Sequence, residues 1–212
     1  MFQVSNLSCS RGNKPLFQSV SFELKAGQAL HLEGDNGVGK TSLLRIVCGL
    51  SPADAGEVRW SDQVIAHDTA AFKSALFYLG HNLSLKEELT ALENLLCDAA
   101  IAERSLSRER ALKALAEMGL RGREHLPLRV MSQGQKRRTA LARLVASQAV
   151  LWVLDEPFVA LDALAVDRLR NLLGRHVQQG GMVLFTSHQP VTLLGAESQD
   201  IAVTRYVLRG VA

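Results

Sequence analysis

The stretch Gly34-Asp35-Asn36-Gly37-Val38-Gly39-Lys40-Thr41-Ser42 decides the fold of this chain. It has the G-x-x-x-x-G-K-[ST] spacing of a phosphate-binding P-loop. The apolar run Ala29–Leu32 before it is typical of a buried strand, and the run Ser42–Val47 after it is typical of a helix that ends near Gly49. A glycine loop between a strand and a helix directs backbone N–H groups and a positive helix terminus at one anion. We therefore expect a nucleotide phosphate to bind here.

Two side chains of this loop suit a nucleoside triphosphate. Lys40 adds a positive charge for the β- and γ-phosphates, and the Thr41 hydroxyl is placed to hold Mg²⁺. A chance match to the pattern is the alternative, but the strand before the loop and the helix after it argue against chance. We expect ATP to be bound by the whole loop: Gly34, Asp35, Asn36, Gly37, Val38, Gly39, Lys40, Thr41 and Ser42.

The composition narrows the class of protein. With 212 residues, of which 47% are hydrophobic, the chain can bury the core of one α/β domain, with or without a small subdomain. Aromatic residues make up only 5%, which argues against a surface that stacks single-stranded nucleic acid. The formal net charge of +3 is too weak to indicate a nucleic-acid partner, although it is compatible with an anionic membrane surface.

The cysteines and the start of the chain favour the cytosol. Cys9, Cys48 and Cys97 have no spacing typical of zinc or of a redox pair, and Cys48 is expected to be a small buried thiol of the P-loop helix. Met1–Val4 lacks a basic stretch followed by an apolar core, so we expect no signal peptide. The longest fully apolar run, Ala149–Leu154, is too short to span a bilayer, so membrane attachment would need another chain.

The first third of the chain outside the P-loop has the pattern of strands. Phe2–Phe22 alternates loosely and predicts two or three short antiparallel strands, and Ala55–Trp60 followed by Ser61-Asp62 predicts a hairpin. Leu76–Leu79 predicts a short strand. The first third of the chain is therefore predicted to be rich in strands.

A helical pattern follows and then gives way to α/β alternation. Thr90 opens one helix with capping-box spacing, Ser107 caps a second helix that Gly119 ends, and Ser132 begins a third. The later elements are a strand over residues 150–154, a helix over about 163–178, a strand over 182–185 and a last strand near 201–208. We therefore predict an α/β core interrupted by a helical insertion.

The strand predicted at Leu151–Leu154 ends in two carboxylates. Asp155 is expected to hold Mg²⁺ through water, and Glu156 to accept a proton from an attacking water or to orient it. Apolar runs that end in acids are common, so this signal is weak alone. It becomes strong because it follows a P-loop at a suitable distance.

A third motif, Met131-Ser132-Gln133-Gly134-Gln135, precedes a basic stretch rich in Ala and Leu. Ser132 offers a hydroxyl, Gly134 lets the backbone approach a phosphate, and a helix N-terminus favours negative charge. A simple serine N-cap with a basic first turn is the alternative. Together with the P-loop and the carboxylate pair, this motif resembles the signature LSGGQ of the ATP-binding cassette (ABC) family.

Two further segments resemble ABC motifs in the expected order. Ala160-Leu161-Asp162 is similar to the D-loop, and Thr186-Ser187-His188 is similar to the segment of the switch histidine. The resemblance implies that His188 contacts the γ-phosphate and acts in catalysis with Glu156 and Lys40. A surface-loop histidine is the alternative for His188.

The resemblance covers essentially the whole chain and implies one ABC nucleotide-binding domain over residues 1–212. The resemblance thus implies a P-loop NTPase of the α/β class with an antiparallel β subdomain. Its core would comprise residues 1–81 and 148–212, and the inserted α-helical subdomain about residues 82–147. The resemblance also implies ATP and Mg²⁺ as cofactors and a head-to-tail homodimer. In that dimer Ser132, Gln133, Gly134 and Gln135 of one copy would contact the ATP held by the other.

Two general positions depart from the ABC pattern, and the signature differs from LSGGQ at two sites, Met131 and Gln133. Arg11 aligns near the A-loop tyrosine, where a guanidinium plane can still stack on adenine. His81 aligns with the Q-loop glutamine, and it could contact Mg²⁺ or water or simply fill the turn. Gln133 replaces a signature glycine, and some ATP affinity or rate would be lost if that backbone needs a positive φ.

The segments around Gly80-His81-Asn82 and 89–95 resemble one branch of the family, the ATP-binding subunits of the haem exporters of cytochrome c maturation. This implies integral membrane partner subunits of that exporter and a peripheral position on the cytoplasmic face of a bacterial inner membrane. No residue suits haem ligation in this chain, since the six histidines are scattered and Cys-x-x-Cys-His is absent. The alternatives are the ATPase of another small exporter and a soluble ABC ATPase without transport.

Overall fold

A computed structural model describes residues 1–12, 14–66, 69–195 and 199–211. The chain divides into two compact units. The first comprises Met1–Gly80, Ala149–Pro157 and Leu173–Ala212, and the second comprises His81–Gln148 and Phe158–Leu172. Each unit is described by itself.

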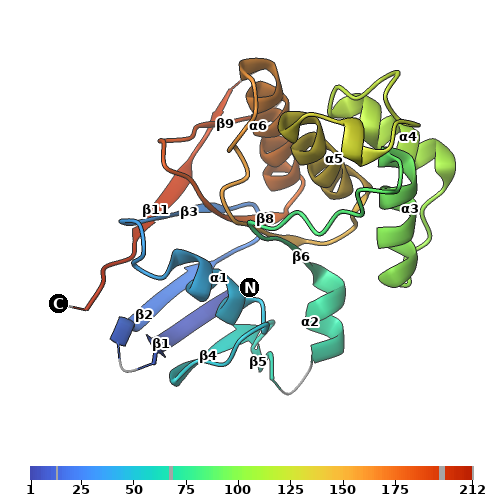
Figure 1. Ribbon diagram of the computed structural model, residues 1–212. Coiled ribbons are helices and arrows are strands. Elements are labelled where there is room, and N and C mark those ends of the chain that lie inside the picture. Colours follow the sequence, from blue (N-terminus) through green and yellow to red (C-terminus); the bar gives the residue numbers. More distant parts are fainter. Residues whose placement is uncertain (13, 67–68, 196–198, 212) are drawn as a thin grey trace. The chain divides into compact units, whose positions relative to one another are not determined.

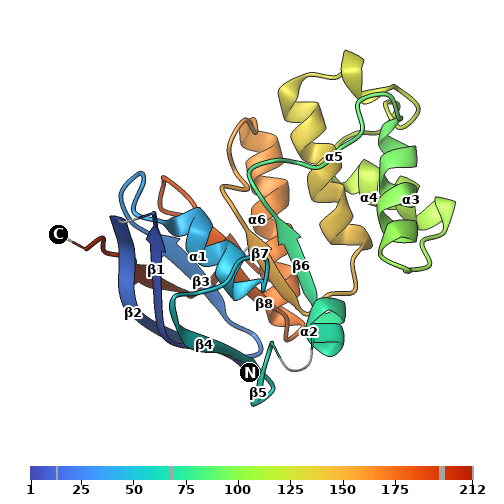
Figure 2. The same cartoon turned by 60° about the horizontal axis from the view of Figure 1, so that its bottom comes forward.

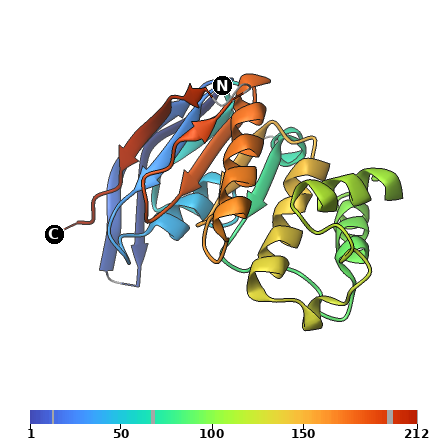
Figure 3. The ribbon, with the colours of Figure 1, turned by 90° about the horizontal axis from the view of Figure 1, so that it is seen from above.

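A parallel sheet forms the centre of the first unit. Its strand order is β11-β3-β8-β7-β6, and every neighbouring pair in it is parallel. The strands are β3 (Ala29–Glu33), β6 (Leu76–Leu79), β7 (Leu151–Leu154), β8 (Met182–Thr186) and β11 (Val203–Val207). All residues of β7 and β8 are buried, as is typical of strands covered on both faces. Figure 3 shows these strands side by side.

A second, antiparallel sheet lies in the same unit, with the order β2-β1-β4-β5. Its strands are β1 (Phe2–Arg11), β2 (Lys14–Leu24), β4 (Ala55–Trp60) and β5 (Gln63–Val64). Helix α1 (Lys40–Val47) lies between the two sheets, as Figures 1 and 2 show, and buries Leu43, Leu44, Ile46 and Val47. This packing fixes the helix that begins at the P-loop lysine against both sheets.

The second unit is helical. Helices α3 (Ala91–Ile101), α4 (Arg108–Glu117) and α5 (Gln133–Ala146) pack against one another, and the 3-10 turn η1 (Leu128–Val130) precedes α5. The first part of α6 (Ala163–Gln178) belongs to this unit and its last turns to the first unit. In the part of the chain that the structure describes, no helix is both long and apolar enough to cross a bilayer.

The helix caps predicted from the sequence are confirmed. Thr90 accepts the backbone N–H of Glu93, whose side chain accepts the N–H of Thr90 in return, so the capping box is complete. Ser107 accepts the N–H of Arg110, and α4 is followed by Gly119 with a φ of 75°. Cys48 is buried, and burial raises the pKa of its thiol.

Two parts of the strand and helix prediction were wrong or incomplete. The single last strand expected near residues 201–208 is two strands, because β10 (Asp200–Ile201) pairs with β9 (Leu193–Leu194) while β11 joins the parallel sheet beside β3. Helix α2 (Thr69–Ala75) was not predicted. Its one large apolar side chain, Phe72, is buried and stacks on Phe2 with ring centroids 6.2 Å apart, a contact between distant segments.

Asn94 is buried and holds the loop ahead of α3 by hydrogen bonds. Its side-chain oxygen accepts the N–H of Lys86 at 2.8 Å, and its amide group donates to the carbonyls of Lys86, Leu89 and Thr90 at 3.0, 3.3 and 2.9 Å. These bonds satisfy backbone groups that a loop would otherwise leave to water.

We predict that Asn94→Ala lowers the free energy of unfolding by about 2–3 kcal/mol, because buried polar groups lose their partners. Urea unfolding measures this change. The control is Asn82→Ala, the same chemical change at an exposed asparagine whose side chain accepts the nearby N–H of Ser84. Equal stability losses in the two variants would contradict the role given to Asn94.

Candidate nucleotide-binding site

Three chain segments meet at the carboxyl edge of the parallel sheet in the first unit. The P-loop follows β3, Asp155 and Glu156 follow β7, and Ser187 and His188 follow β8. The register places Leu32 beside Thr186 and Leu154 beside Phe185, so the three strands end at the same level. Ligands of open α/β sheets bind at this edge.

The P-loop folds around its own lysine. The Lys40 ammonium donates to the carbonyl oxygens of Gly34 at 2.6 Å and Asp35 at 3.1 Å. Gly34 has a φ of 146°, and a Cβ there would lie 2.7 Å from the carbonyl oxygen of Leu208. Gly39 has a φ of 105°, and a Cβ there would lie 3.0 Å from the Phe17 ring. Both conformations and both close approaches therefore require glycine.

Asp155 joins the P-loop helix to β8 through its two carboxylate oxygens. The Thr41 hydroxyl donates to Oδ2 at 2.8 Å, and the Thr186 hydroxyl donates to Oδ1 at 2.9 Å. Asp155 is buried, with 2% of the residue exposed. A hydroxyl and a carboxylate oxygen this close, beside a phosphate loop, are the oxygen donors that Mg²⁺ prefers, and the residues therefore fit the ion.

Glu156 lies next to Asp155 with its backbone in the left-handed region, at a φ of 50°. Its N–H donates to the Thr186 hydroxyl at 2.8 Å, which holds this uncommon conformation in place. Nε2 of His188 lies 3.6 Å from Oε1 of Glu156, and the side chains are 56% and 14% exposed, respectively. His188, predicted to contact the γ-phosphate, and Glu156, predicted to act on water, are thus neighbours.

The sequence assigned no role to Thr186, which bonds Asp155, or to Tyr78, whose phenol is affected by the Asp155 charge. Thr186 is fully buried and links the carboxylate of Asp155 to the backbone of Glu156. Burial, with a smaller contribution from the Asp155 charge, raises the pKa of Tyr78 to about 12, so this phenol stays protonated at neutral pH. The only available signal for Thr186 was its position at a strand end beside Ser187-His188.

The signature residues lie in the second unit, at the N-terminus of α5. Ser132 caps the helix, since its hydroxyl accepts the N–H of Gln135 at 3.3 Å and its own N–H donates to the Gln135 side chain at 3.0 Å. Gln133 is the first residue of α5, so its backbone is helical. It does not have the positive φ that would make glutamine at this position lower the affinity for ATP. A Cβ at Gly134 would lie 2.9 Å from the Ala160 carbonyl oxygen, which gives this glycine a role within the chain.

Three further predicted residues are Asp162, Arg11 and His81. Asp162 caps α6 in the second unit, where its carboxylate accepts the N–H of Ala165 at 2.8 Å. Arg11 is exposed at the end of β1, opposite Lys14. His81 is exposed just after β6, at the start of the second unit. Their roles toward ATP or Mg²⁺ stay predictions.

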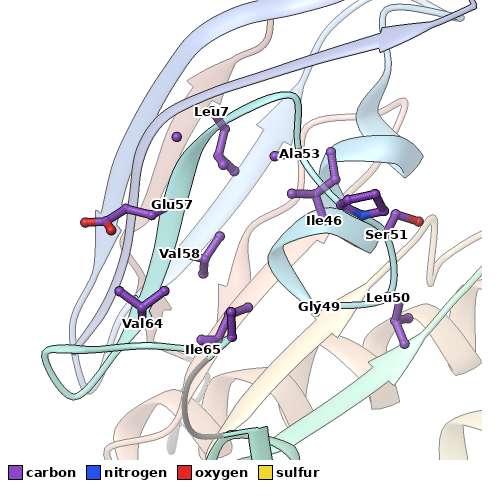
Figure 4. A pocket seen from close by; sticks show the side chains of 13 residues that line it. Leu7, Ile46, Gly49, Leu50, Ser51, Ala53, Glu57, Val58, Val64 and Ile65 are labelled. Carbon is purple, nitrogen blue, oxygen red and sulfur yellow. The ribbon is translucent and has the colours of Figure 1, made fainter.

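A pocket of about 390 Å³ opens at the other end of α1 from Lys40 (Figure 4). It is lined by residues 49–53, which follow the helix, and by apolar side chains that include Leu7, Ile46 and Val58. No residue of Gly34–Ser42 lines it. The pocket is therefore separate from the phosphate loop.

The ABC transporter family model matches residues 17–159. Together with the site described above, this match shows that the chain belongs to the ABC transporter family, whose members bind ATP and hydrolyse it.

Within that family the chain is similar to the cytochrome c biogenesis ATP-binding export proteins CcmA. It is 51% identical to the protein of Dechloromonas aromatica over 91% of this chain and 95% of that protein. It is 45% identical to the protein of Nitrosospira multiformis over 94% of this chain and 97% of that protein. It is 42% identical to the protein of Escherichia coli O157:H7 over 97% of this chain and 97% of that protein.

Solved structures support the fold. A dimeric bacterial ABC transporter cassette superposes with a TM-score of 0.80 at 24% identity and covers 89% of this chain and 88% of that one. The ATP-binding subunit of an ABC transporter gives a TM-score of 0.78 at 25% identity and covers 89% and 80%, respectively. The predicted fold class, an ABC nucleotide-binding fold, is confirmed.

We predict that Thr186→Val lowers both stability and ATP turnover, because valine has a similar size but cannot bond Asp155 or the N–H of Glu156. The buried groups left without this partner should cost about 1–3 kcal/mol in the free energy of unfolding. Urea unfolding and steady-state phosphate release measure the two effects. Thr186→Ser keeps the hydroxyl and is the control. Equal behaviour of the valine and serine variants would contradict a role for this hydroxyl.

Proposed function

We propose that the chain is the ATP-hydrolysing subunit of a membrane export complex that moves or releases haem in c-type cytochrome biogenesis. The observation that supports ATP hydrolysis most strongly is the meeting of the P-loop, Asp155, Glu156 and His188 at one sheet edge. The similarity to the cytochrome c biogenesis export proteins over more than 90% of the chain supports the pathway.

The roles of the side chains follow from their positions. The backbone N–H groups of the P-loop and the Lys40 ammonium would hold the β- and γ-phosphates. Glu156 would orient the attacking water and accept its proton, and His188 would bind the γ-phosphate beside it. Thr41 and Asp155 would hold Mg²⁺, which when bound neutralises phosphate charge.

The signature segment would act on a second copy of the chain. The N-terminus of α5, with Ser132 and Gly134, suits the γ-phosphate of an ATP that the other copy binds. The two copies would close on ATP and open after hydrolysis, and this movement would act on integral membrane partner subunits. The chain would then be peripheral, on the cytoplasmic face of a bacterial inner membrane. The similar bacterial cassette is dimeric, which supports the proposed pairing of two copies.

We predict different defects for two substitutions in the site. Lys40→Ala should abolish ATP binding, because the phosphates lose their main positive charge. Glu156→Gln should retain ATP binding but lower kcat by about 100-fold or more, as expected for loss of a general base. Fluorescent-nucleotide binding and phosphate release separate the two effects.

The controls for these variants are Lys25→Ala and Glu23→Gln, the same changes in an exposed ion pair of this chain. Both should behave like the wild type. Normal steady-state hydrolysis by Glu156→Gln would exclude this glutamate as the residue that activates water.

The pathway is tested in cells whose only copy of the gene encodes Lys40→Ala. We expect haem-stained c-type cytochromes to disappear, and the wild-type or Lys25→Ala chain to restore them. Normal haem staining in the Lys40→Ala cells would remove the pathway from the proposal and leave an ATPase for another export substrate.

A further inference from the structure

A second histidine, His31 in β3, lies within the same unit and is 2% exposed. Its Nε2 is 3.1 Å from the carbonyl oxygen of Ser187, and its Nδ1 is 3.1 Å from a carboxylate oxygen of Glu33. The ring also stacks on Phe185, with centroids 4.8 Å apart and planes 3° apart. Two polar contacts and one aromatic contact therefore restrain the ring.

The sheet register explains why these groups meet. His31 pairs with Phe185 on β8 and with Arg205 on β11, so the three side chains lie in one row on one face of the sheet. Glu33 is two residues beyond His31 and points to the same face. Its carboxylate lies 3.6 Å from Nε of Arg205, so the charge that faces His31 also has a partner on β11.

The contacts fix which ring nitrogen holds a proton. A backbone carbonyl oxygen can only accept a hydrogen bond, so Nε2 must donate to Ser187. The oxygen that faces Nδ1 belongs to a carboxylate, which accepts in the same way. His31 therefore acts as a donor through Nε2 toward the backbone beside the site.

The bond to Ser187 restrains the backbone that leads into His188. The Ser187 carbonyl and the N–H of His188 belong to one planar peptide unit, so a bond that holds the oxygen also orients the start of the next residue. The His188 side chain is 56% exposed and depends on this backbone for its direction toward Glu156.

We propose that His31 is a positioning residue for ATP hydrolysis: it ties the segment of the switch histidine to the strand that leads into the P-loop. This inference rests on the role that the proposed function gives to His188. The positioning role differs from a role in core packing, because positioning requires a hydrogen-bond donor at the place of Nε2 and packing does not.

Two substitutions separate donation from packing. His31→Phe keeps a flat ring against Phe185 but has no donor, and we expect kcat for ATP to fall about tenfold while KM changes little. His31→Gln places an amide N–H near the position of Nε2, and we expect it to restore most of kcat. Steady-state ATP hydrolysis is measured on the full chain purified with its membrane partners.

His176→Phe is the matched control. His176 also stacks on an aromatic ring, that of Trp152 at 3.6 Å, and its Nε2 lies 3.0 Å from the Val150 carbonyl oxygen. Val150 precedes β7, however, and so lies at the opposite edge of the sheet from the site. We expect His176→Phe to leave kcat unchanged. If both phenylalanine variants lose activity only in parallel with their melting temperatures, the positioning role of His31 is wrong.

A double-mutant comparison distinguishes this inference from the role of His188. If His31 acts through His188, the double variant His31→Phe/His188→Ala should be no slower than His188→Ala alone. Multiplied losses in the double variant would overturn the positioning role and leave that of His188 intact. A normal kcat for His188→Ala would instead overturn the proposed role of His188, and the inference with it.

Discussion

The hydrogen bond from Thr41 to Asp155 is the contact on which the rest of the site depends. It joins two residues 114 positions apart, one at the start of α1 and one at the end of β7. The bond can form only because β3 and β7 are parallel and both lie beside β8, so that their carboxyl ends reach one edge. The register of the buried sheet therefore brings the candidate site residues together. The hydrophobic core that fixes α1 between two sheets supplies the rigidity that a site of this kind needs.

Strain at this edge is balanced by buried hydrogen bonds. Glu156 is a non-glycine residue in the left-handed region, a conformation that costs on the order of 1 kcal/mol or more and persists only where its surroundings fix it. Thr186 does this by accepting the Glu156 N–H while it donates to Asp155. One hydroxyl therefore couples the residue that would hold the metal ion to the residue that would act on water.

The sequence predicted the parts of the molecule that depend on local chemistry. The P-loop, the caps at Thr90, Ser107 and Ser132, and the helix over 163–178 follow from patterns within a few residues, and the structure has them. The parts it did not predict depend on pairing between distant segments. Phe72 makes α2 part of the core by stacking on Phe2. Near the end of the chain, β10 pairs with β9 and β11 pairs with β3. The contacts of Thr186 and His31 likewise need the strand order, which no local pattern specifies.

In the signature segment, the structural role of Ser132 is compatible with the functional role proposed for it. Capping by Ser132 uses an acceptor lone pair of its hydroxyl, because the bond comes from the N–H of Gln135. A serine hydroxyl has one donor and two acceptor positions, so the cap leaves the O–H available to donate to a phosphate oxygen. The capping box also fixes the rotamer of that hydroxyl before any ligand arrives, which reduces the entropy lost on binding. A serine N-cap and a phosphate ligand were alternatives in the sequence, and the hydrogen-bond geometry makes them compatible.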